Sequence, residues 1–312
     1  MAACIDLMTR TMASVSQGRA ELPLRTVMPV SRDGRMLGVM PGYLGEPEVV
    51  GTKLVCLFPG NAENGLSSHT GIVALFSPQT GQIMALLDGA EITALRTPAA
   101  TGAASRILAR RDASDMAVLG TGEQALGHLE ALSIAHPGLK RIRLWGRDRA
   151  KAGALVQKAQ AWCPVRIEVI DTVRKTVEGA DIICTVTGAQ DPVLKGAWIM
   201  KGAHVNLVGA SVLSKSEIDV EGVAMGRYFV DYRPAALAQA GELKRAMEAG
   251  LVTQAHIIGE IGAVHLGLCA GRTSDEEITV YKSLGIAAQD LAAANAVLAA
   301  AQRDDLGVKV SM

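Results

Sequence analysis

The spacing of apolar and polar residues changes along the chain, and each change predicts a different kind of structure. Residues 1–20 have a helical pattern that ends in the polar turn Ser16-Gln17-Gly18. Short runs rich in apolar and β-branched residues follow, separated by Gly, Pro, Asn and Asp, at residues 25–30, 36–41, 52–58, 71–76 and 83–87. Because no helical pattern lies between these five predicted strands, we expect them to form an antiparallel sheet.

From residue 97 onward the pattern alternates between helix and strand. Thr97 and Pro98 predict a helix over residues 97–111, with Thr97 as its N-cap and Pro98 in its first turn. Strands are then expected at residues 116–119, 141–145, 167–170, 182–185, 205–208 and 228–230, and helices at 124–134, 149–161 and 173–177. This alternation is typical of an α/β fold with a parallel sheet. An Ala-rich helix over residues 284–303 is expected to pack back onto the N-terminal sheet.

Length and charge narrow the class of protein. A chain of 312 residues favours two domains. It has 31 Lys and Arg against 31 Asp and Glu, with no run of like charges, so neither nucleic acid nor an anionic membrane is an expected partner. Asp6 and Arg10 interrupt the first twenty residues, and no apolar run approaches about 18 residues, so we expect neither a secretory signal nor a membrane span.

The cysteines and histidines indicate a reducing compartment and no metal. Five scattered cysteines without a Cys-x-x-Cys pair are typical of reduced thiols, so we expect a cytoplasmic protein. No set of His, Cys, Asp and Glu residues has metal-ligand spacing. His256 and Glu260, four residues apart, are interpreted as an ordinary helix pair.

The segment Gly120-Thr121-Gly122-Glu123-Gln124-Ala125 has the pattern of a dinucleotide-binding turn. It follows an apolar predicted strand and opens a predicted helix, which is the context that the G-x-G-x-x-A pattern requires. The first glycine permits a tight turn, the second lets the main chain approach a pyrophosphate, and the alanine allows the helix to pack closely. Free N–H groups at the helix start would bind the diphosphate. A purely structural turn is the alternative, but the βα units on both sides favour NAD(P).

The residues after the second strand of this unit bear on the choice between NADPH and NADH. An NAD site usually has an acidic residue at this strand end, whereas here Trp145 is followed by Gly146-Arg147-Asp148-Arg149. Arg147 and Arg149 fit a 2′-phosphate better than a free hydroxyl, so NADPH is the preferred cofactor. Asp148 leaves NADH possible, and a solvated helix face remains the alternative role for the two arginines.

Several segments together resemble the ornithine cyclodeaminase/mu-crystallin family. They run in family order from Arg25 to the C-terminal helix: Arg25-Thr26-Val27, Met40-Pro41, Thr52-Lys53, Ala94-Leu95-Arg96-Thr97, the glycine turn, Asn206-Leu207-Val208-Gly209-Ala210, and Lys282-Ser283-Leu284-Gly285 with Asp290. The resemblance implies a central Rossmann domain at residues 108–282. It also implies an α+β substrate-binding and dimerisation domain from residues 1–107 and 283–312, and a homodimer joined through the N-terminal sheets. Further cofactor contacts are expected from Thr97, Thr185, Val186, Thr187, Val208, Gly209, Ala210, Ser283 and Gly285.

Three cations of the N-terminal region are candidates for binding the substrate. Arginine offers a fork that matches a carboxylate, and a desolvated lysine is both a charge and a proton donor. Taken singly, Arg25, Lys53 and Arg96 are also compatible with ordinary surface charges. The family resemblance implies that they surround the carboxylate of an amino or imino acid, with Lys53 as the catalytic residue. Arg96, directly before the predicted helix start, is alternatively placed to hold the cofactor diphosphate, and His69 is a weaker candidate.

Two departures from the family pattern indicate the reaction. Cyclodeaminases carry an aspartate after the Val-Gly-Gly turn and a glutamate before the Met-Pro pair, where this chain has Ser211 and, near the second position, Gly38. Without these acids, the expected activity is an NAD(P)H-dependent reduction of the C=N bond of a small cyclic α-imino acid. The alternatives are an amino-acid dehydrogenase resembling alanine dehydrogenase, an ornithine cyclodeaminase, and a non-catalytic ligand-binding protein.

Overall fold

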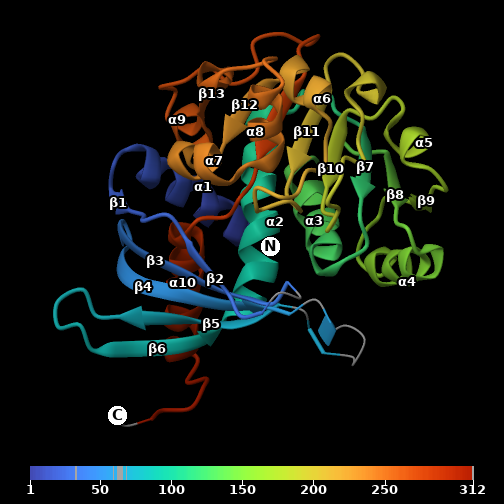
Figure 1. Cartoon of the computed structure of the whole chain (residues 1–312). Coiled ribbons are helices and arrows are strands. Elements are labelled where there is room, and N and C mark those ends of the chain that lie inside the picture. Colours follow the sequence, from blue (N-terminus) through green and yellow to red (C-terminus); the bar gives the residue numbers. More distant parts are fainter. Residues whose placement is uncertain (32–33, 59, 62–65, 68, 311–312) are drawn as a thin grey trace.

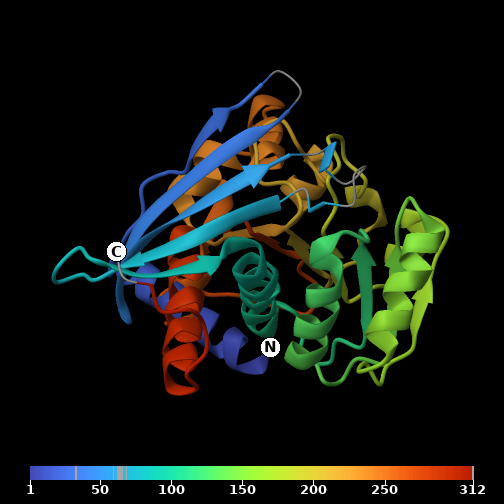
Figure 2. The ribbon, with the colours of Figure 1, turned by 90° about the horizontal axis from the view of Figure 1, so that it is seen from below.

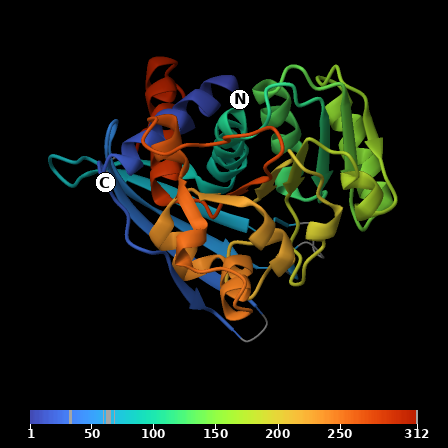
Figure 3. The ribbon, with the colours of Figure 1, turned by 90° about the horizontal axis from the view of Figure 1, so that it is seen from above.

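Two β-sheets organise the computed structural model, which describes residues 1–31, 34–58, 60–61, 66–67 and 69–310. Figures 1 and 3 show the sheets side by side, with helix α2 (Gly89–Leu108) running between them. The first sheet is antiparallel, as predicted. In the described residues its strands are β1 (Ala20–Glu21), β2 (Thr26–Pro29), β3 (Met36–Gly45), β4 (Glu48–Leu57), β5 (His69–Phe76) and β6 (Ile83–Asp88). The short β1 is the one strand here without a sequence prediction.

One face of this sheet is covered by helix α10 (Ala287–Arg303) (Figure 2). Glycines permit the close approach. A Cβ atom at Gly42 would lie 2.9 Å from the Cβ of Ala287, and one at Gly51 would lie 2.7 Å from Cδ2 of Leu291. The predicted return of the last helix onto the N-terminal sheet is therefore confirmed.

The second sheet is parallel throughout and has the strand order β13-β12-β14-β11-β10-β7-β8-β9. The order β9-β8-β7-β10-β11 is that of a Rossmann fold, which confirms the predicted class. The strands are β7 (Asp115–Leu119), β8 (Arg141–Trp145), β9 (Ile167–Val169), β10 (Ile182–Thr185), β11 (His204–Leu207), β12 (Arg227–Val230), β13 (Ile257–Glu260) and β14 (Thr279–Lys282). The helices that follow them are α3 (Glu123–Ala135), α4 (Arg149–Gln160), α5 (Val173–Val177), α6 (Val220–Met225), α7 (Arg233–Gln239), α8 (Gly241–Glu248) and α9 (Ile261–His265).

Strands β13 and β14 were not predicted, because glycine and charged residues interrupt the apolar pattern that is typical of a buried strand. Strand β13 ends in Gly259 and Glu260, and β14 ends in Lys282, which is fully buried. The interpretation of His256 and Glu260 as a helix pair is wrong. His256 lies in a 3₁₀ turn and its Nε2 contacts the carbonyl of Val223, whereas Glu260 ends β13.

Helix α2 begins at Gly89, two turns before the predicted N-cap at Thr97. The side chain of Asp88 caps it by accepting hydrogen bonds from the N–H groups of Ala90 and Glu91. Pro98 therefore lies inside a helix, where proline usually costs about 3 kcal/mol. The ring of Pro98 packs closely against α3, since a Cβ at Gly127 would lie 2.9 Å from its Cγ.

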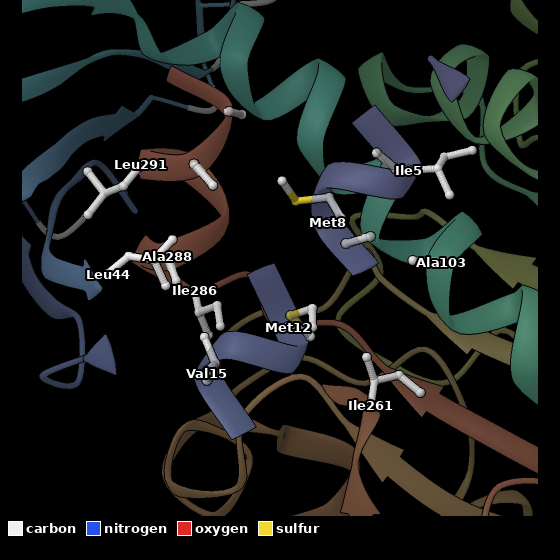
Figure 4. Packing of buried hydrophobic residues seen from close by; sticks show 14 of the residues in the cluster. Ile5, Met8, Met12, Val15, Leu44, Ala103, Ile261, Ile286, Ala288 and Leu291 are labelled. Atoms are coloured by element: carbon white, nitrogen blue, oxygen red, sulfur yellow. The ribbon is translucent and has the colours of Figure 1, made fainter. Parts of the chain in front are cut away.

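Helix α1 (Ala2–Ser16) connects the two halves through one apolar core. Its side chains Ile5, Met8 and Met12 are buried, and Figure 4 shows α1 lying among α2, α10 and Ile261. The helix ends at Ser16, where the sequence predicts the polar turn Ser16-Gln17-Gly18. None of the helices in the described part of the chain has the length and apolar character that crossing a bilayer requires.

Candidate functional site

The glycine turn after β7 has the geometry that a dinucleotide diphosphate requires. Gly120 has φ +123°, and a Cβ there would lie 2.6 Å from the carbonyl oxygen of Val186. Gly122 is the N-cap of α3, no side chain caps that helix, and nothing lies within 4 Å of the position of its absent Cβ. Ala125 is fully buried against the sheet. The open helix start and its free N–H groups therefore fit an anionic diphosphate.

Other predicted cofactor residues lie at the same edge of the sheet, because parallel strands share their carboxyl ends. Thr185 ends β10, and Val186 and Thr187 follow it. Residues 208–210 follow β11, and Ser283 and Gly285 follow β14. Thr97, on α2, is buried, and its hydroxyl has no hydrogen-bond partner among the described residues.

Glu217 holds two of these segments together. Its Oε1 accepts hydrogen bonds from the N–H (2.6 Å) and hydroxyl (2.8 Å) of Thr187, and its Oε2 accepts from the N–H groups of Gly209 (2.6 Å) and Ala210 (3.1 Å). The side chain is fully buried. Sequence analysis did not identify Glu217, because a single acid in a polar loop gives no signal of its own.

A buried ion pair supports the same turn from β14. Lys282 lies 2.7 Å from Oε1 of Glu242, donates a hydrogen bond to the carbonyl of Ala210, and has no exposed surface. This lysine was predicted only as part of the family pattern. Its contacts are with protein groups in the interior.

Of the two arginines predicted to bind the adenosine 2′-phosphate, one is paired with an aspartate and the other, among the described residues, is not. Asp148 caps α4 by accepting from the N–H of Lys151, and Arg149 forms an ion pair with Asp171. Arg147 is exposed, and within the described residues its side chain makes no ion pair or hydrogen bond. A Cβ at Gly146 would lie 2.4 Å from Cγ2 of Thr121, so an acidic side chain at Gly146 requires a shift of Thr121.

Lys53 and Arg96 meet at one carboxylate on α10, although their elements lie far apart in the sequence. Lys53 Nζ and Arg96 Nε each lie 2.8 Å from Oδ1 of Asp290, and Arg96 also donates to Gln289. Lys53 is 3% exposed, Arg96 5% and Asp290 0%. Arg96 lies within α2 and not before its start, because that helix begins earlier than predicted. Its side chain donates hydrogen bonds to Asp290 and Gln289, both on α10.

The charges of this cluster perturb one another. Burial lowers the pKa of Lys53 to about 8, and the negative charge of Asp290 opposes part of that shift. Burial alone would raise the pKa of Asp290, but Arg96 and Lys53 outweigh it and hold that pKa below its ordinary value. Oδ2 of Asp290 has no hydrogen-bond partner among the described residues. Lys53 is thus both a cation and a proton donor close to neutral pH.

Arg25 reaches the same region from the residue before β2. Its Nη2 donates to the carbonyl oxygens of Leu284 (2.7 Å) and Gly285 (2.9 Å). Gly285 has φ +76°, and a Cβ there would lie 2.5 Å from Nη1 of Arg96. The turn after β14 therefore lies between two of the predicted substrate cations, and the structure brings Arg25, Lys53 and Arg96 to one region.

The remaining candidates have less direct geometry. His69 begins β5 and is exposed, with Nδ1 3.9 Å from the carboxylate of Glu123. Ser211 is half-buried after the Gly209-Ala210 turn. Gly38 lies on β3, and a Cβ there would lie 3.1 Å from Cγ1 of Val55, which leaves little room for a glutamate. No group of three or more His, Cys, Asp or Glu side chains in the described ranges is arranged to hold a metal ion.

A model of the ornithine cyclodeaminase/mu-crystallin family matches residues 1–304. The chain belongs to this family. Ketimine reductase mu-crystallin of Rattus norvegicus is 38% identical over 275 residues, which cover 88% of this chain and 83% of that protein. The structure of Thermococcus litoralis Δ1-pyrroline-2-carboxylate reductase in complex with NADH and L-proline matches with TM-score 0.95 and 31% identity, covering 98% of this chain and 95% of that one. An archaeal alanine dehydrogenase dimer with bound NAD matches with TM-score 0.92 and 30% identity, covering 99% and 94%.

Proposed function

We propose that this protein is an NAD(P)H-dependent reductase of small cyclic α-imino acids, such as Δ1-pyrroline-2-carboxylate or Δ1-piperideine-2-carboxylate, which it converts to L-proline or L-pipecolate. One observation carries the proposal: two buried cations, Lys53 and Arg96, share the single carboxylate of Asp290. The cluster therefore has room for one more negative charge, which the carboxylate of an imino acid supplies. The named activities of the rat and Thermococcus relatives support this substrate class.

Each cation has a distinct role in this proposal. Arg25 and Arg96 bind the substrate carboxylate, since guanidinium groups form charge-assisted hydrogen bonds with it. The ammonium group of Lys53 orients the substrate and gives its proton to the imine nitrogen, and it later regains a proton from solvent. When bound, the reduced nicotinamide supplies the hydride that adds to the C=N carbon. The protein's main task is to hold the two reactants in contact.

Cofactor preference is a finer part of the proposal. The preference for NADPH is supported by Arg147, which is exposed two residues after the end of β8 and could donate hydrogen bonds to a 2′-phosphate. The ion pair of Arg149 with Asp171 makes it the weaker contributor. The archaeal and Thermococcus structures contain NAD and NADH, so NADH is the alternative cofactor.

The proposal also includes a homodimer formed through the antiparallel sheets. The face of that sheet opposite α10 exposes Met28, Ile72, Met84 and Leu86. Apolar side chains that gather on one sheet face are typical of an interface. Sedimentation velocity would show a dimer, and replacing Met84 and Leu86 with lysine should give monomers.

The proposed location is the cytoplasm, which accords with five free cysteines.

The decisive experiment measures NADPH and NADH oxidation with a panel of imino and keto acids, with and without ammonia. The proposal expects turnover of the cyclic imino acids without ammonia. Turnover of pyruvate that requires ammonia would instead assign an alanine dehydrogenase activity. The panel should include L-ornithine, from which no proline and ammonia should form, because Ser211 cannot act as a carboxylate base near neutral pH. Ornithine turnover at a comparable rate would contradict the assignment within the family.

A further inference from the structure

Asp231, the residue after β12, is a buried carboxylate for which the proposed reaction has no role so far. It is 1% exposed. Its Oδ2 accepts hydrogen bonds from the N–H groups of Leu284 and Gly285, both at 2.7 Å, and its Oδ1 accepts from the N–H of Tyr232 at 2.9 Å. The carboxylate therefore fixes the turn that leads from β14 into α10.

The same turn is held from its other side by Arg25. In the peptide group between Leu284 and Gly285, the N–H donates a hydrogen bond to Oδ2 of Asp231 and the C=O accepts one from Nη2 of Arg25. Both distances are 2.7 Å. A single peptide thus lies between a carboxylate and a guanidinium. Each charge polarises the peptide in the sense that strengthens the other hydrogen bond. The opposite charges of Asp231 and Arg25 also attract one another directly.

The turn also lies against Arg96, the second arginine of the proposed carboxylate site. Gly285 has φ +76°, and Arg96 occupies the space beside its Cα, with Nη1 2.5 Å from the position of the absent Cβ. A shift of this turn would therefore change the distance between Arg25 and Arg96. That distance determines whether both guanidinium groups can bind one carboxylate.

We propose that Asp231 is a positioning residue that, through the Leu284–Gly285 turn, holds Arg25 in place to bind the substrate carboxylate. The inference rests on the proposed function, because that function assigns the carboxylate to Arg25. Asp231 touches neither substrate nor cofactor in this scheme. It sets the affinity for the carboxylate and leaves the hydride and proton transfers to other groups.

Asp181 provides a matched control for the loss of a buried carboxylate. It is 7% exposed, and its Oδ2 accepts from the N–H groups of two successive residues, Ser114 (2.8 Å) and Asp115 (3.0 Å). It precedes β10 and so lies at the amino edge of the parallel sheet, away from the substrate cations. Asp181→Asn and Asp231→Asn remove the same kind of interaction at opposite edges of the sheet.

The experiment compares D231N, D181N, R25A and the double variant R25A/D231N with the wild type. The measurements are kcat and KM for the imino acid, the Kd of NADPH from its fluorescence, and the Kd of pyrrole-2-carboxylate, a stable planar carboxylate, at saturating NADPH. Both aspartate variants should lower the Tm. D231N should raise KM and the pyrrole-2-carboxylate Kd about tenfold or more, with kcat and the NADPH Kd nearly unchanged. D181N should change none of these constants, and the double variant should match R25A.

The possible failures are distinguishable. If R25A raises KM but D231N does not, or if D181N raises it equally, or if the two effects multiply in the double variant, Asp231 has only a structural role. If R25A itself leaves KM and the pyrrole-2-carboxylate Kd unchanged, the proposed role of Arg25 fails, whatever D231N does. Should D231N not fold, D231S keeps an acceptor oxygen in a smaller side chain and carries the same expectations.

Discussion

Two buried clusters of charge lie near the carboxyl ends of the parallel strands, and they use their charges in opposite ways. The cluster of Lys53, Arg96 and Asp290, named the substrate cluster after its proposed role, has two cations and one carboxylate, and one oxygen of that carboxylate has no partner among the described residues. Its positive charge exceeds what the surrounding protein groups neutralise. Because charges without partners are costly in the interior, this cluster favours an incoming anion.

The turn cluster of Lys282, Glu242 and Glu217 has the reverse composition, with one cation and two carboxylates. Glu217 accepts its four hydrogen bonds from the segments after β10 and β11, and its burial raises its pKa. Its charge is used to hold main-chain segments in place. Buried charge alone therefore does not mark a catalytic group. In the substrate cluster one carboxylate faces two cations, so one positive charge is not neutralised within the cluster.

The largest effect should come from Lys53→Ala. Loss of the proton donor should lower kcat about 10²–10⁴-fold, while the Kd of NADPH stays nearly unchanged, because the contacts of Lys53 are with α2 and α10. Steady-state kinetics and NADPH fluorescence measure the two quantities. Lys201→Ala, which removes an exposed ion pair with Glu276, is the control. Retention of wild-type kcat in the Lys53 variant would eliminate its catalytic role.

In the turn cluster, replacing the lysine with alanine should mainly lower the free energy of unfolding. Lys282→Ala leaves Glu242 buried without its cation, and breaking such a pair typically costs about 3–5 kcal/mol. Urea unfolding measures the loss. If the variant keeps wild-type stability, the ion pair does not stabilise the fold, and the contrast between the two clusters disappears.

The pH dependence of kcat/KM tests the electrostatics of the substrate cluster. Lys53 must be protonated to act, and its pKa is about 8, so kcat/KM should be highest below that pH and fall as the pH rises through it. Asp290 raises the pKa of Lys53. Asp290→Asn should therefore move the falling limb to lower pH, in addition to destabilising the fold. Asp181→Asn should leave the limb unmoved; an equal shift there would show that the electrostatic link between Asp290 and Lys53 is not specific.

The smallest expected effect concerns cofactor choice. Arg147→Ala should raise KM for NADPH about fivefold, corresponding to about 1 kcal/mol for an exposed charge pair, and leave KM for NADH unchanged. Arg149→Ala should do less, since that arginine is paired with Asp171. Equal effects of both variants on both cofactors would assign these arginines to a solvated helix face. Placing an acid at Gly146 is a poor test, because Thr121 occupies the space.

Local patterns and the return of the last helix onto the N-terminal sheet could be predicted from the sequence, but the pairing of individual residues from distant segments could not. The glycine turn after β7 is a contiguous pattern whose chemistry follows from backbone geometry. Lys53 and Asp290 are separated by 237 residues and Arg96 and Asp290 by 194, so no spacing rule connects them. The predicted start of α2 failed because Thr97 and Pro98 imitate a helix start, while the cap that forms is Asp88.

The docking of α10 onto the antiparallel sheet also sets the order in which the protein can mature during synthesis. Lys53 and Arg96 leave the ribosome long before Asp290, and β14, which lies between β11 and β12 in the parallel sheet, is also among the last segments to appear. A nascent chain that ends before these segments can form the nucleotide turn after β7. It cannot complete the parallel sheet or pair the two cations with Asp290. The cluster of Lys53, Arg96 and Asp290 is therefore assembled last, and it forms only when the chain has been made through α10.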